Sequence, residues 1–335
     1  MPRLLLERVG MAHPGDVSAI AALLDSGRLA PGEIRAVVGK TEGNGGLNDF
    51  TRGYFLQSLL HLLAARTGEP PAALAARIPC LLSGGTEGVL SPHAVLFAVR
   101  EEPAAGRGLA LGTGFGPRLP PGAAGTEAHI AAVEATVRAA MAASGIADPG
   151  LVFVKTPAGS LAGMARARAA AALGAARALG DVPQAQASQA ALLRDLSLFS
   201  DRVAVSAGIE VPCDEVILLG EAPGWAPGLA LAVRPMRDVL DIAAVQGLAA
   251  ALGGPARLRA VFAKGEPDVT GHIRGQRHTM LGDTDLDAQR HLRAALGAVV
   301  AAVAGDGRVF VSGGAEHQGP AGGGLVAAIA EQDAP

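Results

Sequence analysis

The chain has 335 residues, of which 50% are hydrophobic, 18% are charged and 3% are aromatic, and its formal net charge is −3. This much apolar sequence can form a large core in two or three domains. Interspersed charges and scarce aromatic side chains argue against a nucleic-acid-binding protein, and apolar runs broken by Gly or Pro exclude a membrane-spanning helix.

The first eight residues lack the long apolar region and the small-residue cleavage site of a secretory signal. The two cysteines, Cys80 and Cys213, make no disulfide framework, which is typical of a reducing compartment. We therefore expect a cytoplasmic protein.

The first third of the chain alternates runs of strand and helix length, separated by Gly, Pro and Asp. Asp16 is a candidate N-cap of the first helix and Gly27 a candidate stop. The predicted elements are a strand at 4–9, a helix at 17–26, a strand at 34–40, a helix that ends near residue 66, and strands at 79–83 and 94–100.

The remaining two thirds repeat this order of elements. The second third predicts a strand at 109–111, a helix at 128–144, a strand at 151–155, a helix at 166–179, and strands at 202–206 and 215–219. The last third predicts a strand at 229–233, a helix at 239–252, a strand at 258–264, a helix at 287–304 and a strand at 308–312. Because Gly- and Pro-rich stretches at 102–126 and 222–228 separate the copies, we expect domains at 1–103, 104–226 and 227–335.

In each copy the second strand ends in a lysine, and a later strand ends in a serine. A period of roughly 110 residues is too long for a solenoid and indicates three copies of one small domain. We expect an α/β fold in which each copy is a β-sheet with helices on one face, arranged about a pseudo-threefold axis with the active site at the centre. The residues concerned are Lys40, Lys155 and Lys264, and Ser83, Ser206 and Ser312.

The lysine–serine pattern suggests nucleophilic catalysis. A serine hydroxyl needs a base to take its proton, and a lysine amine can serve only when it is uncharged. Crowding of three lysines in one cavity would lower their pKa. An acidic residue, Glu42 or Glu266, follows the first and third lysines by two positions and would keep them charged, whereas no acid follows Lys155 closely. Lys155 is therefore the best candidate for the base, with Ser206 as its partner.

The turns after the serines support this choice. The first and third serines are followed by two glycines, whereas Ala207 follows Ser206. Glycines let backbone N–H groups approach a bound carbonyl closely, and the copy that differs is a candidate for the attacking one. For one copy alone, a solvated lysine and an ordinary turn serine would be the better explanation. Three copies in the same order favour a functional site.

Four stretches of the chain resemble the signatures of the ring-opening cyclic amide hydrolases. They are residues 39–45 with 48–52, residues 82–93, residues 273–281 and residues 311–320. The likeness runs nearly from end to end. It implies three similar domains in a triangular assembly around a central active site, in agreement with the internal repeat.

The resemblance implies that the nucleophile and the base come from the second domain, which points to Ser206 and Lys155. It also implies one substrate-binding arginine in each domain. These are Arg52, Arg168 and Arg293, where Arg166 and Arg290 are neighbouring alternatives to the last two. The other substrate-binding positions that it implies are Lys40, Ser83, Gly84, Ala207, Lys264, Ser312 and Gly313.

The resemblance further implies a structural divalent cation in the third domain and no cofactor for catalysis. Its ligands would be Glu266 and the loop residues Ala315, Gln318, Gly319, Pro320 and Gly323. One carboxylate with several carbonyl oxygens suits Mg²⁺ or Ca²⁺. A Glu266 that binds metal is less free to pair with Lys264.

The expected activity is hydrolytic opening of cyanuric acid to carboxybiuret, which loses CO₂ to give biuret. Two alternatives stay open, namely a barbiturase that converts barbituric acid to ureidomalonate and a relative that binds a cyclic imide without opening it. Ala207 lies where many relatives have a second serine, and Gly45 lies where cysteine is common. These departures bear on the choice of substrate. Relatives also suggest a homotetramer.

Overall fold

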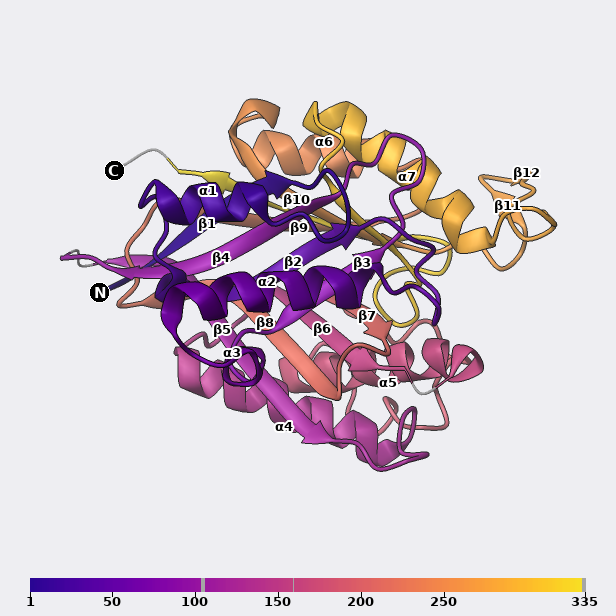
Figure 1. Ribbon diagram of the computed structural model, residues 1–335. Coiled ribbons are helices and arrows are strands. Elements are labelled where there is room, and N and C mark those ends of the chain that lie inside the picture. Colours follow the sequence, from indigo (N-terminus) through magenta and orange to yellow (C-terminus); the bar gives the residue numbers. More distant parts are fainter. Residues whose placement is uncertain (104–105, 159, 333–335) are drawn as a thin grey trace.

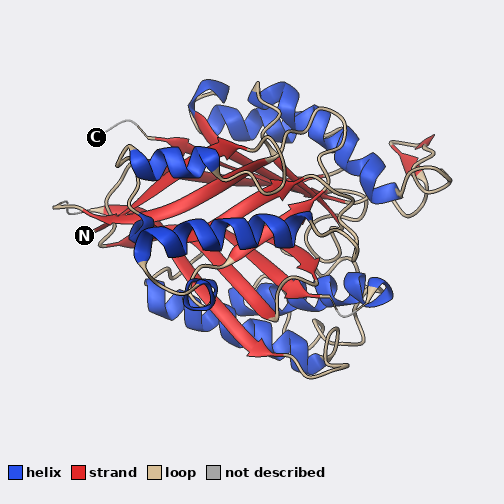
Figure 2. Cartoon of the chain, viewed as in Figure 1, coloured by secondary structure: helices blue, strands red, loops and turns tan. Residues whose placement is uncertain are grey.

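The computed structural model describes residues 1–103, 106–158 and 160–332, and it contains three four-stranded sheets with helices outside them (Figures 1 and 2). We call each sheet with its helices a unit. The first unit has the strand order β1-β4-β2-β3, the second β5-β8-β6-β7 and the third β9-β14-β10-β13. The three orders are equivalent, which confirms the predicted repeat and fold class.

The sheet strands overlap the predicted positions in all three units, except that no strand was predicted at residues 324–331, which form the closing strand of the third unit. In the first unit they are β1 (Pro2–Gly10), β2 (Ile34–Thr41), β3 (Cys80–Gly84) and β4 (His93–Glu101). In the second they are β5 (Arg107–Arg118), β6 (Leu151–Pro157), β7 (Val203–Gly208) and β8 (Cys213–Pro223). In the third they are β9 (Leu229–Met236), β10 (Leu258–Gly265), β13 (Phe310–Gly313) and β14 (Gly324–Glu331), with a small hairpin of β11 (His272–Ile273) and β12 (Gln276–Arg277).

The helices cover one face of each sheet. They are α1 (Ser18–Asp25), α2 (Thr51–Thr67) and α3 (Pro71–Ala75) in the first unit, α4 (Glu127–Ser144) and α5 (Leu161–Leu179) in the second, and α6 (Ile242–Ala251) and α7 (Ala288–Ala304) in the third. Two 3₁₀ turns, Pro31–Glu33 and Pro255–Arg257, precede the lysine strands of the first and third units.

The other face of each sheet packs against the other two sheets. Side chains from all three units form one central apolar cluster there, whereas the faces under the helices form separate clusters. In the centre the ring of Phe262 meets Phe153 at 5.0 Å and Phe310 at 6.1 Å between ring centroids. The strands that end in the lysines and serines are buried over most of their length, because both of their faces are covered, and this explains their continuous apolar runs.

Some boundaries differ from the predicted ones for local reasons. Asp16 is not the N-cap of α1; its carboxylate accepts hydrogen bonds from the amides of Ala12 and Ser18, so it closes the preceding turn. Helix α5 begins five residues before the predicted start, since the Ser160 hydroxyl caps it by accepting from the Gly163 amide. Residues 104 and 105, at the predicted boundary of the first domain, lie outside the described residues, and the domain boundaries stay predictions.

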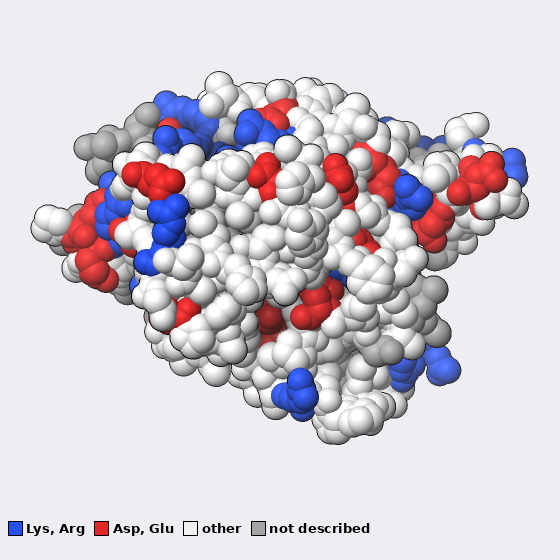
Figure 3. Space-filling view, viewed as in Figure 1, with Lys and Arg blue, Asp and Glu red and all other residues white. Residues whose placement is uncertain are grey.

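The face shown in Figure 3 carries charged side chains of both signs, interspersed and concentrated toward its ends. Within the described residues, no helix has the length and apolar character required to cross a membrane.

Candidate active site

The same strand register holds each lysine beside a serine. Strands β2 and β3, β6 and β7, and β10 and β13 are parallel pairs. Their registers pair Lys40 with Ser83, Lys155 with Ser206, and Lys264 with Ser312. Neighbours in register on parallel strands point to the same face of a sheet, so the backbone places three equivalent lysine–serine pairs.

The three lysines of these pairs are the only lysines in the sequence, and all are buried, with exposed fractions of 0 or 1%. The ammonium group of Lys40 donates to the Ser83 hydroxyl at 3.2 Å and to the Gly84 carbonyl at 2.9 Å. In the same way Lys264 donates to the Ser312 hydroxyl at 2.9 Å and to the Gly313 carbonyl at 3.1 Å. The first and third pairs are therefore near copies.

The second pair has different contacts. The Lys155 nitrogen donates to the carbonyls of Leu82 at 2.6 Å and Ala207 at 3.3 Å, and it forms an ion pair with Glu210 at 2.6 Å. The hydroxyl of Ser206 lies 3.3 Å from that of Ser312. Thus the second lysine is held by carbonyls and a carboxylate.

This geometry contradicts the predicted distribution of acids around the lysines. Glu42 is exposed, and Glu266 is buried against the Gly322 amide, so neither carboxylate pairs with a lysine in the described residues. The acid in contact with a lysine is Glu210, beside Lys155. The prediction failed because it assumed that the strands continue past the lysines, whereas the chain turns away there and a loop brings in the carboxylate.

The pKa shifts follow these contacts. Burial, with Arg293 and Arg168 nearby, lowers the pKa of Lys40 and of Lys264 well below the usual lysine value. Burial also lowers the pKa of Lys155, though less far, and the Glu210 carboxylate opposes the lowering there, as Glu87 does at Lys40 and Glu316 at Lys264.

The three serines open onto one cavity of about 700 Å³. Gly84, Ala207 and Gly313, which follow them, also lie on its wall. The three lysines are buried beneath the serines and do not line the cavity. The three predicted arginines line the same cavity: Arg52 from α2, Arg168 from α5 and Arg293 from α7. The structure thus brings together the serines and arginines on which the sequence prediction depends.

The alternative arginines are placed differently. Arg166 lies outside the wall of this cavity and donates to the Gly125 carbonyl. Arg290 lies on the wall, with 39% of its side chain exposed, and is 3.3 Å from Glu87. Arg168 is therefore the better choice in the second unit, and Arg290 is a neighbour of Arg293 in the third.

Each cavity arginine is held by a glutamate from a different unit. Arg293 makes a two-point ion pair with Glu87, at 2.8 and 2.5 Å, and Arg168 makes one with Glu316, at 3.1 and 2.8 Å. Two-point pairing of this kind fixes the orientation of a guanidinium group. The third glutamate, Glu210, lies 3.0 Å from Arg52.

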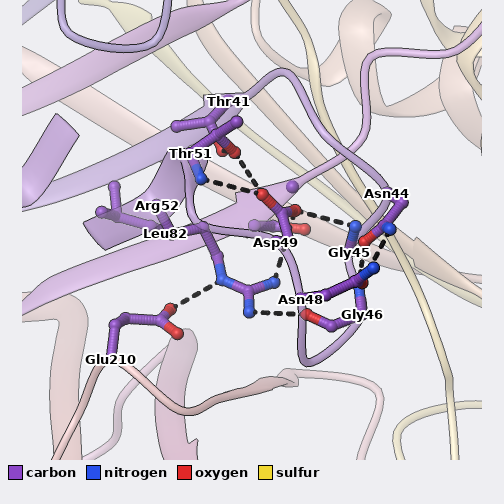
Figure 4. A network of polar contacts seen from close by, with 12 residues as sticks. Thr41, Asn44, Gly45, Gly46, Asn48, Asp49, Thr51, Arg52, Leu82 and Glu210 are labelled. Carbon is purple, nitrogen blue, oxygen red and sulfur yellow. Dashed lines mark hydrogen bonds and ion pairs between the residues drawn. The ribbon is translucent and has the colours of Figure 1, made fainter. Parts of the chain in front are cut away.

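Arg52 has the most contacts of the three. Figure 4 shows it between Asp49 and Glu210, with its third nitrogen near the Gly46 carbonyl. The separations are 3.6 Å to Asp49, 3.0 Å to Glu210 and 3.0 Å to Gly46. Its side chain is 1% exposed. Through its contact with Glu210, Arg52 joins the first and second units as well as lining the cavity.

Sequence reasoning missed these glutamates, although the signal was present. Each of the three serines is followed four residues later by a glutamate, namely Glu87, Glu210 and Glu316. The repetition marks a position with a shared role. Which arginine each glutamate pairs with could not be found in the same way, because each arginine lies on a helix of another unit.

The predicted cation ligands gather around one loop. The Glu266 carboxylate accepts from the Gly322 amide at 3.2 Å, and burial raises its pKa to about 7. A buried carboxylate without a cation in contact is a group that a divalent ion would stabilise. The Gln318 side chain, in contrast, is used in hydrogen bonds with the main chain of Val205, Gly314 and Glu316. Only the main-chain carbonyl of Gln318 could therefore serve as a ligand.

Comparison with known proteins agrees with this architecture. The family model described as amidohydrolase ring-opening protein matches residues 5–163 and 158–331. A cyanuric acid amidohydrolase from Azorhizobium caulinodans is 42% identical, with 98% of this chain and 99% of the relative covered. One from Bradyrhizobium diazoefficiens is 44% identical, with 95% of each chain covered, and a cyclic amide hydrolase from A. caulinodans is 41% identical, with 97% and 98% covered.

Two solved structures are similar along the whole length. A cyanuric acid hydrolase described as an evolutionary innovation by structural concatenation has a TM-score of 0.95 and 39% identity, with 99% of this chain and 100% of the other covered. The cyanuric acid hydrolase of A. caulinodans has a TM-score of 0.93 and 41% identity, with both chains covered completely. The chain therefore belongs to the family of amidohydrolase ring-opening proteins.

Proposed function

We propose that the protein opens the ring of cyanuric acid by hydrolysis and produces carboxybiuret, which then loses CO₂ to give biuret. The observation that carries this proposal is the set of three register-matched lysine–serine pairs around one cavity. Cyanuric acid has three equivalent carbonyls, so each unit can bind one of them. Relatives of similar length that are named cyanuric acid amidohydrolases support the same substrate.

In the proposed mechanism Ser206 is the nucleophile and Lys155 is the base. The uncharged lysine takes the hydroxyl proton while the serine oxygen attacks a ring carbonyl, and main-chain N–H groups near Ser206 stabilise the oxyanion. The C–N bond breaks as the ring nitrogen takes the proton back from the lysine. Water then attacks the acyl-serine and releases the open product. The hydroxyls of Ser83 and Ser312, which line the cavity and accept hydrogen bonds from Lys40 and Lys264, bind the remaining carbonyls.

The choice of Lys155 is supported by basicity. A base works best when its pKa is near the working pH. Burial lowers the pKa of Lys40 and of Lys264 well below the usual lysine value and lowers that of Lys155 less, and only at Lys155 do the described contacts include a carboxylate in an ion pair with the lysine nitrogen, at 2.6 Å. The lysine that has an acid in contact is thus the better base, for a reason opposite to the one inferred from the sequence.

We also propose that a structural Mg²⁺ or Ca²⁺ binds Glu266 and the carbonyls of Ala315, Gln318, Gly319, Pro320 and Gly323, where it would order the loop after Ser312. A homotetramer in the cytoplasm is a further proposal, supported by the family likeness and by two free cysteines. Light scattering would test the tetramer.

The test of the proposed function is turnover of two rings in parallel. With cyanuric acid we expect biuret and CO₂ in equal amounts, and with barbituric acid slower release of ureidomalonate without CO₂. Faster turnover of barbituric acid would favour the barbiturase alternative, which the relative named more broadly as a cyclic amide hydrolase keeps open. Binding of either ring with no product at enzyme excess would show a non-catalytic protein.

A further inference from the structure

The three glutamates after the serines form a cyclic set of contacts between units. Glu87 of the first unit holds Arg293 of the third. Glu316 of the third unit holds Arg168 of the second, and Glu210 of the second unit contacts Arg52 of the first. Each glutamate therefore crosses to a helix of another unit, always in the same direction around the axis.

Glu210 differs from Glu87 and Glu316 because one of its carboxylate oxygens contacts both a lysine and an arginine. One oxygen of Glu210, Oε1, lies 2.6 Å from the Lys155 nitrogen and 3.0 Å from Arg52 Nε. The other two glutamates use both oxygens on the guanidinium of their arginine. The carboxylate of Glu210 is 6% exposed, so solvent screens these charges little.

The course of the backbone explains this difference. Two residues after the first and third serines, Gly85 and Gly314 have φ angles of +95° and +82° and turn the loop in a left-handed conformation. The equivalent Gly208 instead continues strand β7. A side chain at Gly208 would meet the Glu210 carboxylate at 2.1 Å, so this glycine lets the carboxylate fold back toward the lysine.

Other charged groups around Lys155 are farther away or have other partners. Arg52 lowers the pKa of Lys155, and Lys155 lowers that of Lys264. Glu215 is the neighbour of Lys155 on β8, at the position where β4 places His93 and β14 places Leu325. Its carboxylate accepts a hydrogen bond from the Cys80 amide at 2.7 Å, and burial raises its pKa to about 7.

We propose that Glu210 is a positioning residue for the reaction, which holds Lys155 and sets the pH at which that lysine can act as a base. Its carboxylate lies in contact with the lysine nitrogen, a feature that the described contacts of Lys40 and Lys264 do not include. The role of Lys155 as base rests on the proposed function, whereas control of its protonation by Glu210 can be measured without any substrate.

The direct test uses the low lysine content of the chain. Protein labelled with [¹³Cε]lysine has three lysine signals, and the loss of one signal in Lys155→Arg assigns the second lysine. An opposite charge within about 4–6 Å favours the charged form by about 1–3 pKa units. In Glu210→Gln we therefore expect the titration midpoint of Lys155 to fall by about one pH unit or more, while those of Lys40 and Lys264 stay in place.

Glu87→Gln is the matched control, because it removes the equivalent carboxylate, which pairs with Arg290 and Arg293 and raises the pKa of Lys40, not that of Lys155. It should leave the Lys155 midpoint unchanged and raise the KM. Glu215→Gln tests the other nearby acid, and we expect a smaller shift than in Glu210→Gln. If Glu210→Gln does not fold, Glu210→Asp retains the charge at a greater distance and should lower the midpoint partially.

The kinetic consequence has the same sign. Because the base must be uncharged, kcat/KM should rise as the pH passes upward through the pKa of Lys155, and Glu210→Gln should move that rise to lower pH. A Lys155 midpoint that is the same in Glu210→Gln as in the unmodified protein would overturn the inference. Failure of the unmodified protein to open either ring would refute the proposed function but leave the NMR result decisive for Glu210.

Discussion

The second unit differs from the first and third in chemistry while it shares their backbone. All three units place a lysine and a serine in register on parallel strands. In two units the lysine donates to its own serine, and in the second it contacts Glu210 instead. A repeated fold therefore supplies equivalent positions, and one carboxylate on a differently turned loop is enough to make one position unlike the others.

The largest expected effect is a loss of kcat when the lysine–serine pair of the second unit is mutated. Ser206→Ala and Lys155→Ala should each lower kcat by a factor of about 10⁴ or more, since nucleophile and base act as a unit. Ser83→Ala should mainly raise the KM. Steady-state kinetics on cyanuric acid would measure all three. An equal loss of kcat in Ser83→Ala, or substantial turnover by Lys155→Ala, would contradict the assignment of the second unit.

The next largest effect is a difference in the free energy of unfolding between two arginine variants. Arg52→Ala leaves the carboxylates of Asp49 and Glu210 buried without the guanidinium, and breaking a buried pair in this way costs about 3–5 kcal/mol. Arg293→Ala should cost less, because Glu87 retains Arg290 at 3.3 Å. Urea denaturation would measure both losses. Equal losses would show that the additional contacts of Arg52 do not contribute to stability.

A divalent cation should stabilise the folded protein by binding at Glu266 in the third unit. At a concentration 100 times its Kd, Mg²⁺ or Ca²⁺ should stabilise the chelator-treated protein by about 2.7 kcal/mol. Glu266→Gln should remove this response, and thermal unfolding with and without the cation would detect it. A full response in Glu266→Gln would place the cation elsewhere.

The smallest effect concerns the acid after the first lysine. Glu42→Gln should change the free energy of unfolding by less than about 0.5 kcal/mol, because surface substitutions rarely do more, and the Lys40 signal should titrate as before. The exposed position of Glu42 is the reason. A clear shift of the Lys40 midpoint would restore the pairing inferred from the sequence.

The threefold repeat of apolar runs explains why much of the fold was predictable from the sequence. Continuous apolar runs, each ending in Lys or Ser, occur three times, and repetition converts three weak local signals into a strong one. The strand order β1-β4-β2-β3 and its two equivalents were not predicted, because the order depends on pairing between strands that are distant in the chain. The early start of α5 and the turn made by Asp16 were missed because each depends on the hydrogen bonds of one side chain.

The sequence by itself determined the repeat and the lysine–serine pairs, because both depend on short-range pattern and on spacing within a unit, and the resemblance to a known family pointed to the arginines. The tertiary structure alone decided which acid faces which base. Glu210 lies 55 residues after Lys155 and 158 residues after Arg52 in the chain, and only the folding of one unit against another brings the three together. Charge interactions depend on separation in space and on burial, which local sequence does not specify.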